Sequence, residues 1–133
     1  MDLASALLKR LDDDTAVTAL VGTRKHWVTR KQGDPLPAIV LQVISEDRPQ
    51  HLAGFEAMRT ARVQVGALAL KYGEARQVLE AAIAALVEPV IVDNVRFWRA
   101  TVEGPRDTAE EVAGVGMVHR PIADLMIRYA IQS

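Results

Sequence analysis

The sequence predicts an α+β fold in which a mostly antiparallel β-sheet is packed by an N-terminal helix and a longer central helix. Apolar residues recur at three- and four-residue steps near the N-terminus and over 74–88, which is the spacing of a helix face. In contrast, segments 38–45, 59–70 and 122–131 show the β-branched content or the apolar/polar alternation of strands. The 133 residues, half of them hydrophobic, suit one domain, so we expect a single domain over 1–133.

The N-terminal part predicts two consecutive helices. Leucines and alanines from Leu3 onward share one stripe, and this first helix should end near Asp12. The side-chain oxygens of residues 12–15 can cap a second short helix over 16–21. Gly22 can then adopt the left-handed turn that ends it. The adjacent aspartates are therefore interpreted as caps and not as a calcium loop, whose alternating ligands and closing glutamate are missing.

Strands are expected on both sides of a proline-containing connection. Residues 24–30 and 38–45 are rich in β-branched and aromatic side chains. Apolar residues occupy both faces of 38–45, so this segment is a candidate central strand buried on both sides. The polar stretch 46–58 leads to a long strand over 59–70 and exceeds the usual hairpin loop, so we expect it to be a contact arm.

The clearest helix covers 74–88 and stops at Pro89. Strands over 90–92 and 95–102 follow, and the Asp93-Asn94 pair between them tolerates the positive φ angles of a tight hairpin turn.

The C-terminal part predicts a loop and a closing strand. Segment 103–117 contains several glycines and a proline among acidic residues and has no sustained period, so we expect a second long loop. Residues 122–131 then alternate between an apolar face and a mixed face, as a half-buried strand does.

Catalytic and cofactor motifs are missing from the sequence. His26, His51 and His119 lie on separate predicted elements, without metal-ligand spacing, and the chain has no cysteine. No serine sits in a Gly-x-Ser-x-Gly turn, and no glycine-rich phosphate loop occurs. We therefore expect a protein that is not an enzyme and holds no cofactor or metal. A small enzyme whose residues converge only in space stays open as an alternative.

A basic segment supplies the other alternative. The net charge of −1 gives the whole molecule no attraction for nucleic acid or for an anionic membrane surface. Locally, however, bases flank an aromatic ring as in a platform for single-stranded nucleic acid. Its candidate contacts are Arg24, Lys25, Trp27, Arg30 and Lys31. Basic residues also protect an exposed edge strand from unwanted pairing, so DNA contact is the alternative reading.

A membrane location is not expected. The longest apolar run, 81–87, is far below the roughly 18 residues that suggest a membrane span. The N-terminal decapeptide places an acid before its apolar stretch and bases after it, the reverse of a secretory signal. A soluble protein made in the cytoplasm is the expectation.

The order of these features resembles the small phage and prophage tail-completion proteins, also called tail terminators or head-tail joining proteins. The phrases that carry the resemblance are DTAVTALVGTR at 14–24, PLPAIVLQVIS at 35–45, HLAG at 51–54, ARVQV at 61–65 and YGEA at 72–75. The chain departs from the family at Ala57, where a second glycine is frequent, and over 125–130, where the closing strand is less aromatic.

This resemblance implies a virion structural and assembly protein that is synthesised and assembled in the bacterial host cytoplasm. It further implies a sheet backed by helices, self-association as a hexameric ring, and contacts with the tail-tube protein and the head connector, with no catalytic residue carried over. We expect the interfaces on segments 46–58 and 103–117. The candidate interface residues are Arg48, His51, Phe55, Arg59, Arg106, Asp107, Glu110 and Glu111.

Overall fold

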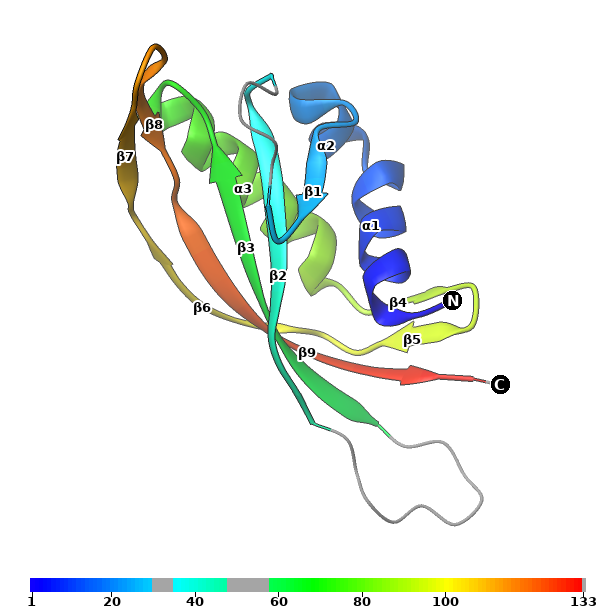
Figure 1. The fold of residues 1–133 in the computed structure, drawn as a ribbon. Helices are drawn as coiled ribbons and strands as arrows, with labels where there is room; N and C mark the ends of the chain where they lie inside the picture. Colours follow the sequence, from blue (N-terminus) through cyan, green and yellow to red (C-terminus); the bar gives the residue numbers. More distant parts are fainter. Residues whose placement is uncertain (30–34, 48–57, 133) are drawn as a thin grey trace.

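The computed structural model describes residues 1–29, 35–47 and 58–132, in which three helices lie against one face of a curved β-sheet (Figure 1). The helices are α1 (Leu3–Asp13), α2 (Thr15–Val21) and α3 (Tyr72–Val87). The strands are β1 (Lys25–Trp27), β2 (Ala38–Asp47), β3 (Arg59–Leu68), β4 (Val90–Val92), β5 (Val95–Phe97), β6 (Thr101–Arg106), β7 (Ala109–Val112), β8 (Gly116–His119) and β9 (Ile122–Ile131). The expected α+β class, with an N-terminal helix and a longer central helix, is confirmed.

The sheet is mostly antiparallel, as expected. Its strand order is β1-β2-β3-β9-β5-β4, and β6 also pairs with β9. Among the strand pairs of the described ranges, only β1 with β2 is parallel. The hairpin of β7 and β8 forms a separate two-stranded sheet, which stands at the upper end of β3 in Figure 1.

Strand β2 corrects one expectation about the sheet. It lies second from the edge, between β1 and β3, whereas β3 and β9 form the centre. Residues 38–41 are buried, but Val43 and Ile44 are exposed. The reason is that the helices cover only part of the sheet, so the second half of β2 extends beyond them (Figure 1). Burial on both faces therefore holds for the first half of the strand alone.

The hydrophobic core fills the space between the helices and the sheet. Alternate residues of β3 and β9, among them Val63, Val65, Leu125 and Ile127, meet buried side chains such as Leu79 of α3. Each such large aliphatic side chain stabilises the fold by about 1.5–3 kcal/mol relative to an exposed position. The sheet face that points away from the helices, here called the open face, carries polar side chains in alternation with this core. Within the described ranges, no helix is long and apolar enough to cross a membrane.

Local signals in the sequence place the helix ends. The Asp2 carboxylate accepts a hydrogen bond from the Ser5 amide at 2.8 Å and caps α1. In the same way, the Asp14 carboxylate accepts from the Val17 amide at 3.0 Å and caps α2. Gly22 ends α2 with a φ of 58°, as expected. These contacts satisfy amide groups that have no partner inside the helix.

Arg10 joins α1 to the end of α3, a contact that the sequence did not indicate. Its side chain is buried, and Nη2 donates to the carbonyl oxygens of Ala85 at 3.0 Å and Glu88 at 2.6 Å. The guanidinium also lies over the Phe97 ring, 4.8 Å from the ring centroid. Burial lowers the pKa of Arg10 to about 10, and the nearby Glu88 opposes this change. Arg10 thus satisfies carbonyls that the helix end leaves unpaired.

The expectation of a long loop over 103–117 was wrong. β6 continues to Arg106 and pairs with β9, while β7 and β8 form a hairpin. Gly114, with a φ of 79°, lies in the turn of this hairpin, and Gly116, with a φ of 106°, begins β8. The glycines and the proline favoured a loop in the sequence. β6 forms a strand because it pairs with β9, and β7 and β8 because they pair with each other, and no local period indicates such pairing.

Other strand boundaries also differ from expectation. The segment 95–102 is split into β5 and β6, because the Ala100 amide turns to the carbonyl of Val87 at 3.0 Å. β1 ends at Trp27, since Val28 adopts a φ of 65°. The expected turn at Asp93 is confirmed by its φ of 49° between β4 and β5.

Candidate interaction surface

The β7–β8 hairpin gathers the expected interface residues of the C-terminal half. Arg106 ends β6, Asp107 lies between β6 and β7, and Glu110 and Glu111 lie on β7. All four side chains are exposed. In Figure 1 the hairpin rises beyond the end of the central strands, where it can reach other molecules. Glu110 and Glu111 therefore lie on a projecting hairpin that the sequence predicted to be a loop, whereas Arg106 and Asp107 lie at its base.

A cluster at the base of the hairpin fixes it to the start of α3. The Asp107 carboxylate accepts hydrogen bonds from the Tyr72 hydroxyl at 3.1 Å and from Arg76 Nη1 at 3.5 Å. Arg76 also donates to the Tyr72 hydroxyl and to Glu80, and these bonds, the one to Tyr72 first, raise the pKa of Arg76. The Tyr72 ring meets the His119 ring edge to face, with centroids 5.9 Å apart. Asp107 thus holds the hairpin in place.

The open face carries a second charged cluster below the hairpin. Arg62 Nε and Nη2 donate to Asp124 Oδ2 at 3.2 and 3.1 Å, and Nη2 also bonds the Glu103 carboxylate. These hydrogen bonds, the one with Asp124 first, raise the pKa of Arg62. Arg106 Nη1 lies 3.9 Å from the same Asp124 oxygen. Arg106 is therefore part of an ion network on β3, β6 and β9.

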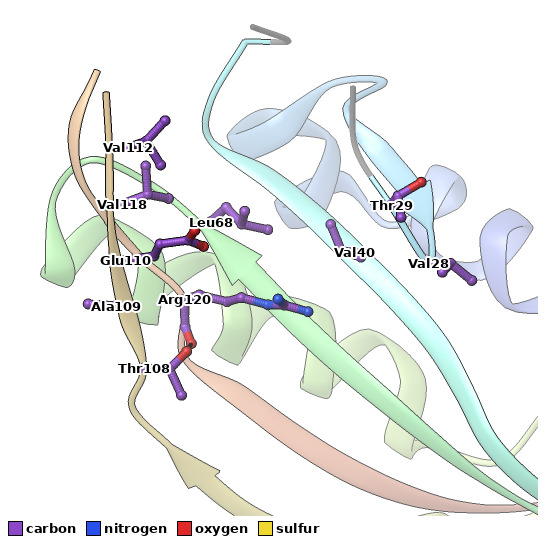
Figure 2. Close-up of a pocket in the computed structure, with 10 residues that line it drawn as sticks. All are labelled: Val28, Thr29, Val40, Leu68, Thr108, Ala109, Glu110, Val112, Val118 and Arg120. Atoms are coloured by element: carbon purple, nitrogen blue, oxygen red, sulfur yellow. Dashed lines mark hydrogen bonds between the residues drawn. The ribbon is translucent and has the colours of Figure 1, made fainter. Parts of the chain in front are cut away.

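A groove of about 760 Å³ separates the hairpin from the open face (Figure 2). Thr108, Ala109, Glu110, Val112 and Val118 line it from the hairpin side. Val40 and Leu68 of the sheet, together with Val28 and Thr29 after β1, line the opposite side. The groove is mostly apolar, and its charged side chains are Glu110 and Arg120.

Arg120 lies in this groove, although no sequence pattern pointed to it. The residue connects β8 to β9, and Figure 2 shows its side chain extending across β3 toward β2. A Cβ atom at Gly66 would lie 3.4 Å from Arg120 Nε and 3.2 Å from Ile122 Cγ2. The absence of a side chain at Gly66 thus leaves the space in which Arg120 lies.

Comparison with known proteins identifies the family. The family model described as tail completion protein gp17 matches residues 5–127. The chain belongs to the tail completion protein gp17 family. Among solved structures, a chain of a particle titled "Virion of native gene transfer agent (GTA) particle" is similar at 21% identity and a TM-score of 0.60. That match covers 98% of this chain and 95% of the other. No curated protein matches the chain in sequence.

Family membership makes this tail-completion chain a structural and assembly protein of the virion. Its partners are accordingly other structural proteins of such particles. A structural family also favours a role without catalysis. Within the described part of the chain, no three His, Cys, Asp or Glu side chains are grouped as metal ligands would be.

The basic segment of the tail-completion chain is largely engaged in internal contacts. Arg24 Nε donates to the Pro37 carbonyl at 2.7 Å. Lys25 Nζ donates to the Gly22 carbonyl at 2.7 Å and pairs with Asp12, and its side chain is only 4% exposed. Trp27 is half-buried against the core. Arg30 and Lys31 lie outside the described residues. The described contacts thus favour a structural role for Arg24 and Lys25 over a nucleic-acid platform.

Of the expected interface residues that precede α3, only Arg59 lies in the described part of the tail-completion chain. Arg48, His51 and Phe55 are outside the described residues. Arg59 begins β3 opposite Tyr129, at the end of the strand away from the hairpin. Beside it the Tyr129 hydroxyl donates to Glu46 at 3.0 Å, and burial, followed by this bond, raises the pKa of Tyr129. The structure therefore places Arg59 apart from the hairpin residues.

Proposed function

We propose that the chain acts as a tail terminator, in which copies join head to tail as a hexameric ring. This ring caps the tail-tube protein, meets the head connector and is assembled in the bacterial host cytoplasm. Each copy would fold as a single domain over 1–133 and act through protein contacts, with no catalytic step. The proposal rests on membership of the tail-completion family and, above all, on the projecting β7–β8 hairpin.

The hairpin has the properties of a preorganised contact element. Its base is tied to α3 through Asp107, so little ordering entropy remains to be lost on binding. Its exposed side chains combine two carboxylates with large apolar groups, which suits a protein interface with a polar rim. These exposed residues are Glu110, Glu111, Val115 and Met117.

A ring needs two different contact surfaces on each copy, because a head-to-tail interface joins unlike patches. Among the described residues, Arg59 and the proposed interface residues near the hairpin lie at opposite ends of β3. The hairpin group contains Arg106, Asp107, Glu110 and Glu111. The second group contains Arg59 and, earlier in the sequence and outside the described residues, Arg48, His51 and Phe55. Charge in both groups would favour correct pairing over incorrect association.

Reversing the charge of the hairpin tests this proposal. In a host strain whose own copy is deleted, the Glu110→Lys/Glu111→Lys chain should give at least about tenfold fewer complete tailed particles, because like charges at an interface oppose association. Particles are counted by negative-stain imaging, and the purified chain is checked for an unchanged melting temperature. A control, Gln77→Lys, changes an exposed residue of α3 that lies outside these surfaces.

The control chain should restore normal particle numbers. Normal numbers with the Glu110→Lys/Glu111→Lys chain would contradict the role of the hairpin. Complete particles in the deletion strain itself would contradict the terminator function.

A further inference from the structure

Although the Glu110 carboxylate also lines the groove, Arg120 has no ion-pair partner among the described residues. The side chain is half-buried, its Nε is fully buried without a hydrogen-bond partner, and no hydrogen bond or ion pair of its guanidinium occurs within the described residues. A guanidinium removed from water without a partner is unfavourable, whereas a carboxylate can accept two parallel hydrogen bonds from it. The groove therefore suits a ligand that brings a carboxylate.

The position of this guanidinium is built into the fold. The Arg120 amide donates to the Thr108 carbonyl at 2.7 Å, and the Thr108 amide donates back to the Arg120 carbonyl at 3.3 Å. Gly66 leaves the space across β3 that the side chain occupies. Around it the groove presents apolar side chains, including Val40, Leu68 and Val118. A matching ligand therefore combines one carboxylate with apolar groups.

The β4–β5 hairpin of the chain has this composition. Ile91 on β4 is 66% exposed, more than any other large hydrophobic residue described, and the adjacent Val90 is 40% exposed. Asp93 forms the turn, is exposed, and makes no hydrogen bond or ion pair with any part of the chain that the structure describes. Exposed apolar side chains beside an unpaired acid are typical of a contact surface.

The two surfaces lie at opposite edges of the sheet. β4 is one edge strand, while the groove adjoins β1, the other edge strand (Figure 1). One chain cannot bring them together, but successive copies can. Contacts between unlike patches of identical chains are head-to-tail contacts, which generate rings or filaments.

We infer that the groove beside Arg120 binds the β4–β5 hairpin of a second copy, with Asp93 of that copy paired to the guanidinium and Ile91 among the apolar side chains. The inference rests on the proposed head-to-tail assembly and names the surfaces that form its interface. The occupant is a second copy because the complementary charge and the apolar residue both occur on this chain, at the required edge.

Cross-linking between copies tests the inference, since the natural chain has no cysteine. A full-length Val90→Cys/Val112→Cys chain places one thiol on β4 and one in the groove. Treatment of the concentrated protein with a short bis-maleimide should give a ladder of covalent multimers on a denaturing gel. The control pair, Val90→Cys/Gln77→Cys, moves the second thiol to the exposed side of α3 and should give no ladder.

Charge exchange then tests the predicted pair. Adding Arg120→Glu to the Val90→Cys/Val112→Cys chain should lower multimer yield at least about tenfold, because two acids would then meet. Adding Asp93→Arg as well should restore the ladder. The inference is overturned if the multimer yield is no higher than that of the control pair. It is also overturned if the charge changes leave the multimer yield the same.

The result is distinguishable from failure of the proposed function. That function is decided by particle counts in the deletion strain, whereas the inference is decided by cross-linking of the purified chain. One outcome separates the two. If complete particles form only when the chain is present but no specific cross-link forms at the groove, the tail-terminator role is supported and this interface is contradicted.

Discussion

Arg10 shows how one buried side chain joins two helices of this fold. Its guanidinium satisfies two carbonyls at the end of α3 and covers the Phe97 ring, so α1, α3 and β5 meet at one point. Burial lowers its pKa to about 10, because removing the charged guanidinium from water is unfavourable. The hydrogen bonds offset this cost only while both carbonyls are in place.

Replacing Arg10 should therefore lower stability clearly. The Arg10→Met chain keeps an apolar stem but leaves the Ala85 and Glu88 carbonyls without this donor, and we expect a loss of about 2–4 kcal/mol in the free energy of unfolding. Urea denaturation measures this change. The control is Lys9→Met, which removes an exposed ion pair with Asp13 and should cost no more than about 0.5 kcal/mol. Equal losses in the two chains would contradict the bridging role of Arg10.

At the scale of elements, the β7–β8 hairpin depends on contacts outside itself. A two-stranded hairpin is marginally stable alone. Here Tyr72, Arg76 and Asp107 hold its base, and backbone hydrogen bonds between Ala69 and His119 add a short bridge to the end of β3. The hairpin is therefore a local unit whose order can change while the core remains folded.

Removing the base cluster should loosen the hairpin selectively. In the Asp107→Ala chain, the amides of residues 109–119 should exchange with solvent several-fold faster, because the hairpin loses its link to α3. Hydrogen exchange read by mass spectrometry measures this, and the midpoint of thermal unfolding should stay nearly unchanged. As a control, Arg99→Ala breaks the exposed pair with Glu88, at 3.2 and 2.9 Å, and should leave these amides unaffected. Unaltered exchange in Asp107→Ala would show that the hairpin is held by other contacts.

At the scale of the whole molecule, helices and sheet share one hydrophobic core. Buried residues of α1, α2 and α3 belong to the same cluster as those of β2, β3, β5 and β9. Unfolding one layer would expose the apolar face of the other. This arrangement couples the N-terminal helices to the C-terminal strand, although they are far apart in the sequence.

We therefore predict one cooperative unfolding transition for the purified chain. Calorimetry should give equal calorimetric and van't Hoff enthalpies, on the order of 90 kcal/mol for a chain of this length. Two separated transitions, or a calorimetric enthalpy well above the van't Hoff value, would contradict the single-domain proposal for 1–133.

Much of this fold could be inferred without a structure, because its signals are local. The stripe of α1, the Asp14 cap, the turn at Asp93 and the alternation of β9 depend on neighbouring residues. Helical spacing, capping and turn preference act over a few positions, so the sequence expresses them directly. Part of the proposed interaction surface was named from the sequence for the same reason, since the acids Glu110 and Glu111, which are exposed in the structure, form a charged segment.

The remaining features depend on contacts between residues far apart in the chain. β6 forms because β9 supplies its hydrogen-bond partners, which outweighs the glycine and proline in its sequence. Arg120 lies in the groove because Gly66, 54 positions earlier, leaves space for it. Arg10 is buried because the end of α3 offers carbonyls. Pairing, burial and vacant space arise only when distant segments meet, so no local pattern encodes them.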